Sequence, residues 1–323
     1  MSTQDPAVPS THLHEETGRS VRTHTLAAGE LLAVFRPEQG MLCTSLKHRG
    51  EEILRRVDEM DEALATGMSI GIPLNYPFAN RLRGTSYDFD GREVHLDPAS
   101  PWLMKDWNDI IIHGVPWPKL EWRVQEATDR RLRSRLAWNR PELLGVFPFE
   151  HEVEMTATLD GLGLTIETAV LATAGTRVPV SFGFHPYIGV PGLRRDQWRL
   201  SLPAMQGIVL DARLLPVGER TDLPAYDDRL ADLDFDHGFA FVSGAPSMSI
   251  EGNGRRVTVD FLENFRYAQI YAPPGFDYIS LEPMTAPADA LRSHEDLPVV
   301  DAGGRFAATF RIRVEPTHGA SLH

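Results

Sequence analysis

Hydrophobic and polar residues alternate with a period of two through much of the chain. The clearest case runs from residue 153 to residue 170, where apolar residues recur at every second position on both sides of the dipeptide Asp160-Gly161. A β-strand places successive side chains on opposite faces, and Asp-Gly favours a tight turn. This stretch therefore predicts a β-hairpin with one buried face.

The same alternation recurs at residues 87–96, 248–261 and 310–314, in the first two cases around glycine-containing turns. Helical spacing is scarce and predicts only short helices near residues 57–64 and 286–291. Many short strands separated by Gly, Pro and Asp turns are typical of antiparallel sandwiches. The predicted fold class is therefore all-β, as a large antiparallel sandwich with few short helices.

The chain has 323 residues, of which 42% are hydrophobic and 24% are charged, as in an ordinary globular protein. The 24 prolines are dispersed and mark no linker. We therefore expect a flexible tail over residues 1–21 and a single domain over residues 22–316. No apolar run approaches the roughly 20 residues of a membrane helix, and the polar N-terminus does not resemble a secretory signal. These features predict a cytoplasmic location and no membrane partner.

The net charge of −13 argues against nucleic acid or an anionic membrane as a partner, because an acidic chain repels phosphates. The single cysteine, Cys43, forms no internal disulfide and no thiolate zinc site, and its apolar surroundings predict a core position. Phosphate-binding loops, Gly-x-Ser-x-Gly and His-Glu-x-x-His are absent from the sequence.

Four segments are unlike ordinary strands or turns: residues 71–82, 110–114, 178–187 and 277–287. Strand alternation places His185 on the same face as Ser181 and Gly183, whose small size leaves room for a ligand beside the imidazole. It also places Glu282 opposite the core residues Ile279 and Leu281. His185 and Glu282 both precede proline, which stiffens the backbone there. Geometry alone predicts a polar site rimmed by aromatic residues, with candidate proton donors and acceptors.

At these four segments the chain resembles the aldose 1-epimerase (galactose mutarotase-like) family. The resemblance covers roughly residues 22–315. It rests on Pro73 to Gly84 with its Asn-Arg pair, on Ile112-His113-Gly114, on Gly183-Phe184-His185-Pro186-Tyr187, and on Leu281 to Pro287. The resemblance implies a β-supersandwich and an isomerase that interconverts the anomers of a free sugar without cofactor or metal.

The resemblance also implies roles for individual residues. Glu282 would act as the base at the anomeric hydroxyl, His185 as the acid at the ring oxygen, and His113 as a hydrogen-bond donor near it. Arg81 and Asp236 would hold sugar hydroxyls. Asp232 and Asp234 compete with Asp236 for that place, and Asn80 and Tyr278 are further candidate binding residues.

Two other functions stay open at this point. One is an epimerase of a modified sugar, such as a hexose 6-phosphate, a sugar acid or a ketose. The other is a different class: a non-catalytic sugar-binding module, or an enzyme in which the histidines and a carboxylate hold a metal. The scarcity of basic residues near His185 and Glu282 favours an unphosphorylated substrate. The preferred sugar and the oligomeric state do not follow from the sequence.

Overall fold

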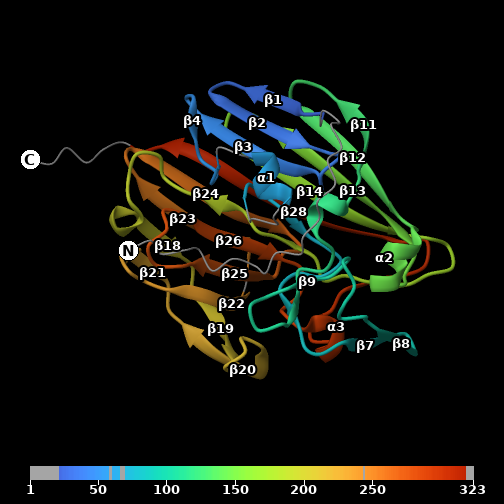
Figure 1. Cartoon of the computed structure of the whole chain (residues 1–323). Coiled ribbons are helices and arrows are strands. Elements are labelled where there is room, and N and C mark those ends of the chain that lie inside the picture. The colour runs from blue at the N-terminus through green and yellow to red at the C-terminus, as the bar shows by residue number, and fades with distance from the viewer. Residues whose placement is uncertain (1–21, 58–59, 66–69, 243, 318–323) are drawn as a thin grey trace, which may run out of the picture.

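Two large antiparallel sheets contain most of the strands (Figure 1). The computed structural model describes residues 22–57, 60–65, 70–242 and 244–317. The tail predicted for residues 1–21 lies outside the described residues. Within the described part of the chain, strands dominate and helices are short, which confirms the predicted all-β sandwich.

The larger sheet has nine strands, and the predicted hairpin forms the third and fourth of them. Residues 151–159 pair in register with residues 163–172, so that Leu159 lies opposite Leu164. Their alternating burial confirms the predicted period of two. In sheet order the strands are β11 (Arg123–Ala127), β12 (Arg131–Trp138), β13 (His151–Leu159), β14 (Gly163–Ala172), β28 (Arg305–Pro316), β24 (Arg255–Glu263), β23 (Ser247–Gly252), β18 (Arg199–Leu202) and β21 (Tyr226–Arg229).

The second sheet has eight strands, and two of the unusual sequence segments lie in its middle. In order, its strands are β20 (Pro216–Leu223), β19 (Met205–Leu210), β22 (Phe235–Phe241), β25 (Tyr267–Ala272), β26 (Ile279–Met284), β16 (Gly183–Phe184) and β5 (Leu74–Asn75), with β17 (Tyr187–Ile188) also paired to β26. The polar segments 178–187 and 277–287 are therefore neighbours in space.

Four smaller sheets surround these two. They comprise β1 (His24–Ala28), β2 (Leu31–Arg36), β3 (Leu42–His48) and β4 (Glu51–Glu52); β6 (Arg81–Leu82), β10 (Ile111–Ile112) and β9 (Met104–Lys105); β7 (Ser86–Phe89) with β8 (Arg92–His95); and β15 (Val178–Pro179) with β27 (Val299–Val300). The β7–β8 hairpin confirms the prediction for residues 87–96.

The helices are short. They are α1 (Met60–Ala65), α2 (Pro141–Val146), α3 (Ala290–Ser293) and the 3₁₀ turns η1 (Trp117–Lys119) and η2 (Arg195–Gln197). Helices α2 and α3 lie toward the right and lower right of Figure 1, whereas α1 lies in front of the strands. Helix α1 lies where it was predicted, whereas α3 begins four residues after the start of the predicted 286–291 turn. Helix α2 was not predicted, because six residues are too few to display helical periodicity.

One face of the eight-stranded sheet packs against the nine-stranded sheet. The rings of Phe184 and Phe310 lie 4.8 Å apart across this interface, and those of Phe241 and Phe261 lie 4.7 Å apart. Side chains from both sheets belong to one continuous apolar cluster. Because the inner face is filled with apolar side chains, polar side chains on the same strands lie on the opposite face.

Strand register aligns the polar side chains of that opposite face in rows across the sheet. Tyr187, Ser280, Tyr271 and Asp236 are successive cross-strand partners. In the adjacent row Glu282, Gln269 and Gly238 are partners. Residues of one row share a face, so the register alone brings side chains from four strands together.

Gly183 has a different role from the one predicted. A Cβ at this position would lie 2.9 Å from the Cβ of Ala79 and 2.7 Å from the carbonyl oxygen of Pro283. The space beside Gly183 is therefore filled by the 71–82 segment, which hydrogen-bonds to Ser181 and Tyr187 through backbone groups. The expectation of ligand space at Gly183 is wrong, because the glycine permits close backbone packing instead.

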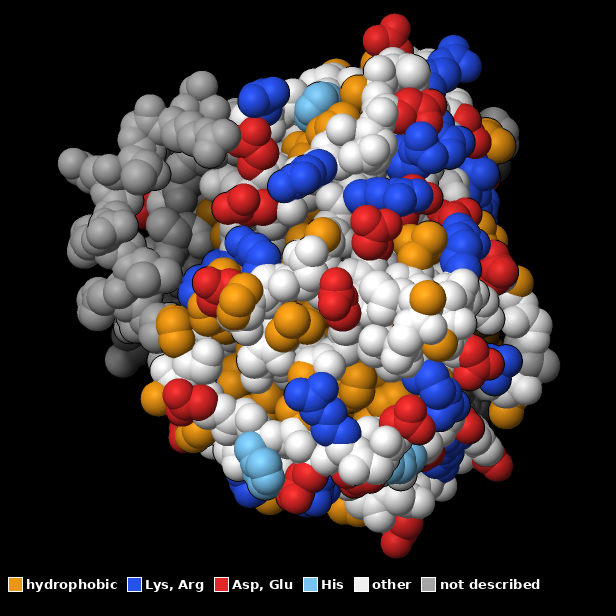
Figure 2. All heavy atoms as spheres, turned by 90° about the vertical axis from the view of Figure 1, so that its right-hand side faces the viewer, with side chains coloured by type: hydrophobic (Ala, Val, Ile, Leu, Met, Phe, Trp, Pro, Cys, Tyr) orange, Lys and Arg blue, Asp and Glu red, His pale blue; other side chains and the backbone are white. Residues whose placement is uncertain are grey.

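The surface carries both signs of charge. Figure 2 shows basic and acidic side chains interspersed on one face, with hydrophobic side chains between them. That face has no continuous basic patch of the kind that a phosphate backbone requires. No helix among the described residues has the length and apolar character needed to cross a membrane.

Candidate active site

His185 and Glu282 lie opposite each other on the polar face of the eight-stranded sheet. The pairs Tyr187–Ser280 and Gly183–Met284 bracket them in the register. Nε2 of His185 lies 3.1 Å from Oε1 of Glu282, and both side chains are buried. Yet Oε1 has no aligned hydrogen-bond donor among the described residues. A buried carboxylate oxygen without a donor is open to a ligand hydroxyl.

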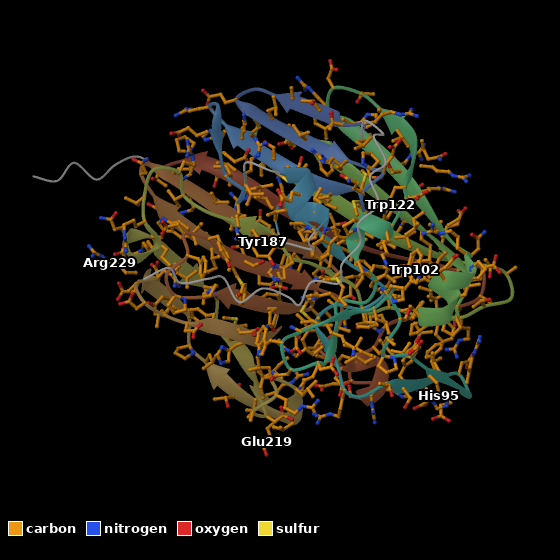
Figure 3. The ribbon with its side chains drawn as sticks, in the orientation of Figure 1. His95, Trp102, Trp122, Tyr187, Glu219 and Arg229 are labelled. Atoms are coloured by element: carbon orange, nitrogen blue, oxygen red, sulfur yellow. The ribbon has the colours of Figure 1, made fainter. Side chains whose placement is uncertain are left out.

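The imidazole of His185 is fixed by its neighbours. The ring of Tyr187 stacks on it with 4.3 Å between ring centroids, and Oγ of Ser280 lies 2.8 Å from Nδ1. Figure 3 shows Tyr187 near the middle of the molecule, whereas His95 and Glu219 lie at its periphery. The imidazole is therefore held in one orientation inside the protein, with Nε2 toward Glu282.

Burial shifts the protonation of both members of the pair. It raises the pKa of Glu282 well above its ordinary value, the negative charge of Asp236 adds to this rise, and Arg81 opposes it. Burial lowers the pKa of His185 to about 3. Both shifts favour the neutral forms, so a proton shared by the pair lies preferentially on Glu282 rather than on His185.

A three-stranded sheet places a second group of polar residues above this pair. Arg81 begins β6, His113 directly follows β10, and Asp106 directly follows β9. Arg81 pairs with Ile112 and so lies beside His113 at one end of this sheet. Asp106 lies at the other end and is reached by the Arg81 side chain. The rings of His113 and His185 lie 5.7 Å apart, so this group faces the proton-exchanging pair.

His113 is oriented as a hydrogen-bond donor. The backbone N–H of Asn80 donates to its Nδ1 at 3.1 Å, so a neutral ring carries its proton on Nε2. Burial lowers the pKa of His113 well below its ordinary value, and positive charge on Arg81, and on His185 when it is protonated, lowers it further. Gly114 follows with a φ of +69°, and a Cβ there would lie 2.4 Å from the carbonyl oxygen of Tyr76. Close packing of the two segments thus fixes this histidine.

Arg81 links two carboxylates. Its guanidinium donates from Nε to Asp106 at 2.7 Å and from Nη2 to Asp236 at 3.2 Å, and the side chain is only 3% exposed. Nε2 of Gln269 donates to the other oxygen of Asp236 at 2.6 Å. Asp236 is therefore a fixed acceptor at the edge of the site, with 23% of its side chain exposed. Asp232 and Asp234 are exposed on the chain preceding β22.

An exposed tryptophan borders the site next to Arg81. Oδ1 of Asp106 accepts hydrogen bonds from the backbone N–H groups of Asn108 and Ile110, which closes a tight loop. Trp107 lies on this loop with 54% exposure, and its ring is 5.2 Å from Cζ of Arg81. Asp106 thus anchors both the arginine and the loop that carries the aromatic ring.

The two remaining predicted residues lie at the margins. Oδ1 of Asn80 accepts from the backbone N–H of Arg81 at 2.7 Å, and Asn80 lines a small pocket with Gln269 and apolar side chains. Tyr278 is buried against Tyr187, with 5.5 Å between ring centroids, and Arg55 lies over its face. Tyr278 therefore supports the stacked Tyr187.

Several site residues were not predicted from the sequence. Gln269, Asp106, Ser280, Tyr187 and Trp107 all contact a predicted residue. Ser280 and Tyr187 lie in the unusual segments, each two residues from Glu282 or His185 in the sequence. That spacing could have identified them as site residues. Gln269 and Asp106 lack any such signal, because only the strand order brings them to Asp236 and Arg81.

A metal-binding arrangement of the kind considered above has no counterpart in the described part of the chain. No group of three or more His, Cys, Asp or Glu side chains among the described residues has a geometry suited to a metal ion. Cys43 is buried in the apolar core, as predicted.

Comparison with known proteins places the chain in a family. The model of the aldose 1-epimerase family matches residues 22–313. YihR, an uncharacterised protein of Escherichia coli K12, is 25% identical over 251 residues, which are 73% of this chain and 76% of that protein. YphB of the same organism is 26% identical over 263 residues, covering 74% of this chain and 82% of YphB.

Solved structures share the fold. Slr1438 from Synechocystis is 25% identical, with a TM-score of 0.76, over 95% of this chain and all of that chain. A galactose mutarotase-like protein from Clostridium acetobutylicum, at 19% identity, has a TM-score of 0.79 over 92% of this chain and 96% of its own. The second likeness concerns the fold alone, whereas the family match extends over most of the sequence. The chain belongs to the aldose 1-epimerase family.

Proposed function

We propose that the protein is a mutarotase that interconverts the α and β anomers of a free sugar by acid–base-catalysed ring opening and closure. The observation that carries this proposal is the His185–Glu282 pair, with 3.1 Å between Nε2 and Oε1. Mutarotation needs an acid and a base that act on two oxygens bonded to the same carbon, the anomeric hydroxyl and the ring oxygen. Two adjacent proton-exchanging groups match that demand.

The pair can exchange one proton in either direction, as a reversible reaction requires. Because burial favours the shared proton on Glu282, that proton first passes to Nε2 of His185, 3.1 Å away. Glu282 as carboxylate then takes the proton of the anomeric hydroxyl, while His185 as imidazolium delivers its Nε2 proton to the ring oxygen. The bond between the anomeric carbon and the ring oxygen breaks, and an open-chain aldehyde forms. After rotation about the adjacent carbon–carbon bond, the protons return and the ring closes on the other face. The pair holds one proton before and after.

The other polar groups hold the sugar in place. His113, with its proton on Nε2, donates toward the ring oxygen and stabilises the charge that develops there. Asp236 and Arg81 bind hydroxyls remote from the anomeric carbon, and their mutual contact fixes both. Asn80 and Tyr278 have supporting roles.

The arginine contacts support an unphosphorylated substrate. Arg81 is buried against Asp106 and Asp236. Arg83, the other arginine of that segment, contacts Asp289, Asp211 and the carbonyl oxygen of Pro216. A phosphate dianion needs cations that are not already paired with carboxylates.

The decisive experiment is an anomerisation screen by polarimetry or NMR. Fresh α-glucose, α-galactose, sugar acids, ketoses and hexose 6-phosphates are compared, with and without a chelator. We expect acceleration with at least one unphosphorylated aldose and no effect of the chelator. Sugar binding without acceleration would instead identify a binding module, and loss of activity with chelator would identify a metal-dependent enzyme.

A further inference from the structure

Ser280 is a fully buried serine whose hydroxyl lies between two groups of the His185 segment. Its Oγ is 2.8 Å from Nδ1 of His185 and 2.9 Å from the carbonyl oxygen of Pro186. The register places Ser280 opposite Tyr187, one row from the His185–Glu282 pair. The hydroxyl is thus fixed by strand pairing on the side of the imidazole that faces away from Glu282.

The number of hydrogens determines the direction of these two contacts. A serine hydroxyl has one proton, and a carbonyl oxygen only accepts hydrogen bonds. The hydroxyl proton therefore belongs to the contact with Pro186, and the serine oxygen accepts a hydrogen bond from His185. Such an arrangement requires a proton on Nδ1 of the imidazole.

We propose that Ser280 is a positioning residue that keeps the proton of neutral His185 on Nδ1, so that Nε2 alone exchanges protons with the substrate. The proposal rests on the proposed mutarotase function for its catalytic meaning. When His185 gives up its Nε2 proton to the ring oxygen, the proton on Nδ1 stays in the bond to Ser280. The resulting neutral ring presents a lone pair on Nε2, ready to take the same proton back on ring closure.

The two histidines of the site are thereby set in opposite tautomers by different neighbours. The backbone N–H of Asn80 donates to Nδ1 of His113, which places the proton of that ring on Nε2. Ser280 accepts from Nδ1 of His185, which leaves Nε2 of that ring as an acceptor. Nε2 of His113 is therefore a permanent hydrogen-bond donor, whereas Nε2 of His185 exchanges its proton. The centroids of the two rings lie 5.7 Å apart.

The first test measures the tautomer of the wild-type protein and needs no turnover. Ring ¹⁵N NMR of ¹⁵N-histidine-labelled protein is recorded from pH 5 to pH 9, and the His185 signals are assigned by their absence in His185→Asn. We expect a protonated Nδ1 throughout this range. An unprotonated Nδ1 at any of these pH values would overturn the proposal, even if the protein proves to be an active mutarotase.

The second test removes the hydroxyl. Ser280→Ala should lower kcat roughly 10- to 100-fold, as loss of an orienting partner typically does, and leave KM nearly unchanged. Its His185 signals should show a fraction with unprotonated Nδ1. Ser134→Ala is the matched control, because Ser134 is fully buried in β12 and its Oγ has no hydrogen-bond partner among the described residues.

The outcomes separate this proposal from the proposed function. In one outcome the wild-type protein anomerises no sugar, but Nδ1 of His185 is protonated and loses protonation in Ser280→Ala. This result refutes the proposed function and supports the role of Ser280. A folded Ser280→Ala variant with wild-type kcat and an unchanged Nδ1 signal refutes the role of Ser280 alone.

Discussion

Arg81 and Asp236 are 155 residues apart in the sequence, yet Nη2 of the arginine lies 3.2 Å from Oδ2 of the aspartate. The aspartate receives a second hydrogen bond from Gln269 at 2.6 Å. These two bonds fix an anionic acceptor at the edge of the site, on the same sheet as Glu282. The contact joins the irregular segment 71–82 to the polar face of the eight-stranded sheet.

Asp236→Asn should raise KM about 10-fold or more with a smaller loss of kcat, because charge-assisted hydrogen bonds to the arginine and to a sugar hydroxyl weaken together. Steady-state polarimetry over a range of sugar concentrations measures both constants. Asp234→Asn is the control, since Asp234 is exposed outside the site. A larger effect at Asp234 than at Asp236 would show that the wrong aspartate has been assigned.

Glu282→Gln and His185→Asn should each lower turnover at least roughly 100-fold, because each removes one of the two groups that exchange protons with the sugar. Circular dichroism verifies folding before the rates are compared. Glu152→Gln, on the same kind of strand but half-exposed in the nine-stranded sheet, should retain full activity. Wild-type rates in either site variant would eliminate the proposed acid–base pair.

The rate should show a bell-shaped dependence on pH, because the proposed mechanism requires one proton on the His185–Glu282 pair. On the acid side a second proton is taken up, at a pH below the ordinary value of histidine since burial lowers the pKa of His185. On the alkaline side the single proton is lost, at a pH above the ordinary value of a carboxyl since the pKa of Glu282 is raised.

Asp236→Asn should move the alkaline limb of this profile to lower pH, because the negative charge of Asp236 contributes to the raised pKa of Glu282. Profiles of kcat/KM from pH 4 to pH 10 for both proteins measure the shift. A flat wild-type profile would contradict the shared-proton pair.

Glu282→Gln should stabilise the protein at alkaline pH. The folded-state pKa of Glu282 lies above its unfolded value of 4.5, so wild-type stability falls as the pH rises between the two. Over that window the advantage of the variant grows by about 1.4 kcal/mol per pH unit. Urea unfolding at pH 5 and pH 8 measures it, and an advantage that does not increase with pH would contradict burial as the cause.

Arg83→Ala should leave the activity on free aldoses nearly unchanged. The rate on hexose 6-phosphates, which we expect to be low in the wild-type protein, should also not change. The guanidinium of Arg83 is already paired with the carboxylates of Asp289 and Asp211, so it is a poor partner for a phosphate. The ratio of kcat/KM for glucose or galactose to that for its 6-phosphate is the measurement. A preference for the phosphate that disappears in Arg83→Ala would favour a sugar-phosphate epimerase.

The hairpins and the core faces followed from the sequence because alternation is a local property. Residues 153–159 display it whatever their partners are. The strand faces of His185 and Glu282 followed for the same reason. By contrast, Gln269 and Asp106 reach the site only through strand order, which no local pattern encodes. Gly183 shows the same limit, since Ala79 fills the space beside it from about 100 residues away in the chain.

The site residues come partly from regular strands and partly from a connecting loop, so substitutions in the two parts should have different effects. Glu282, Ser280 and Gln269 are held by the ladder of a central sheet, whereas Trp107 and Asp106 belong to a tight loop at its border. Exchanging Trp107, whose side chain is 54% exposed, leaves the ladder and the Asp106–Arg81 contact in place. Under the proposed function, exchanges at Trp107 would alter which sugars are accepted while the reaction stays the same, so a redesign of the substrate range should begin at this residue.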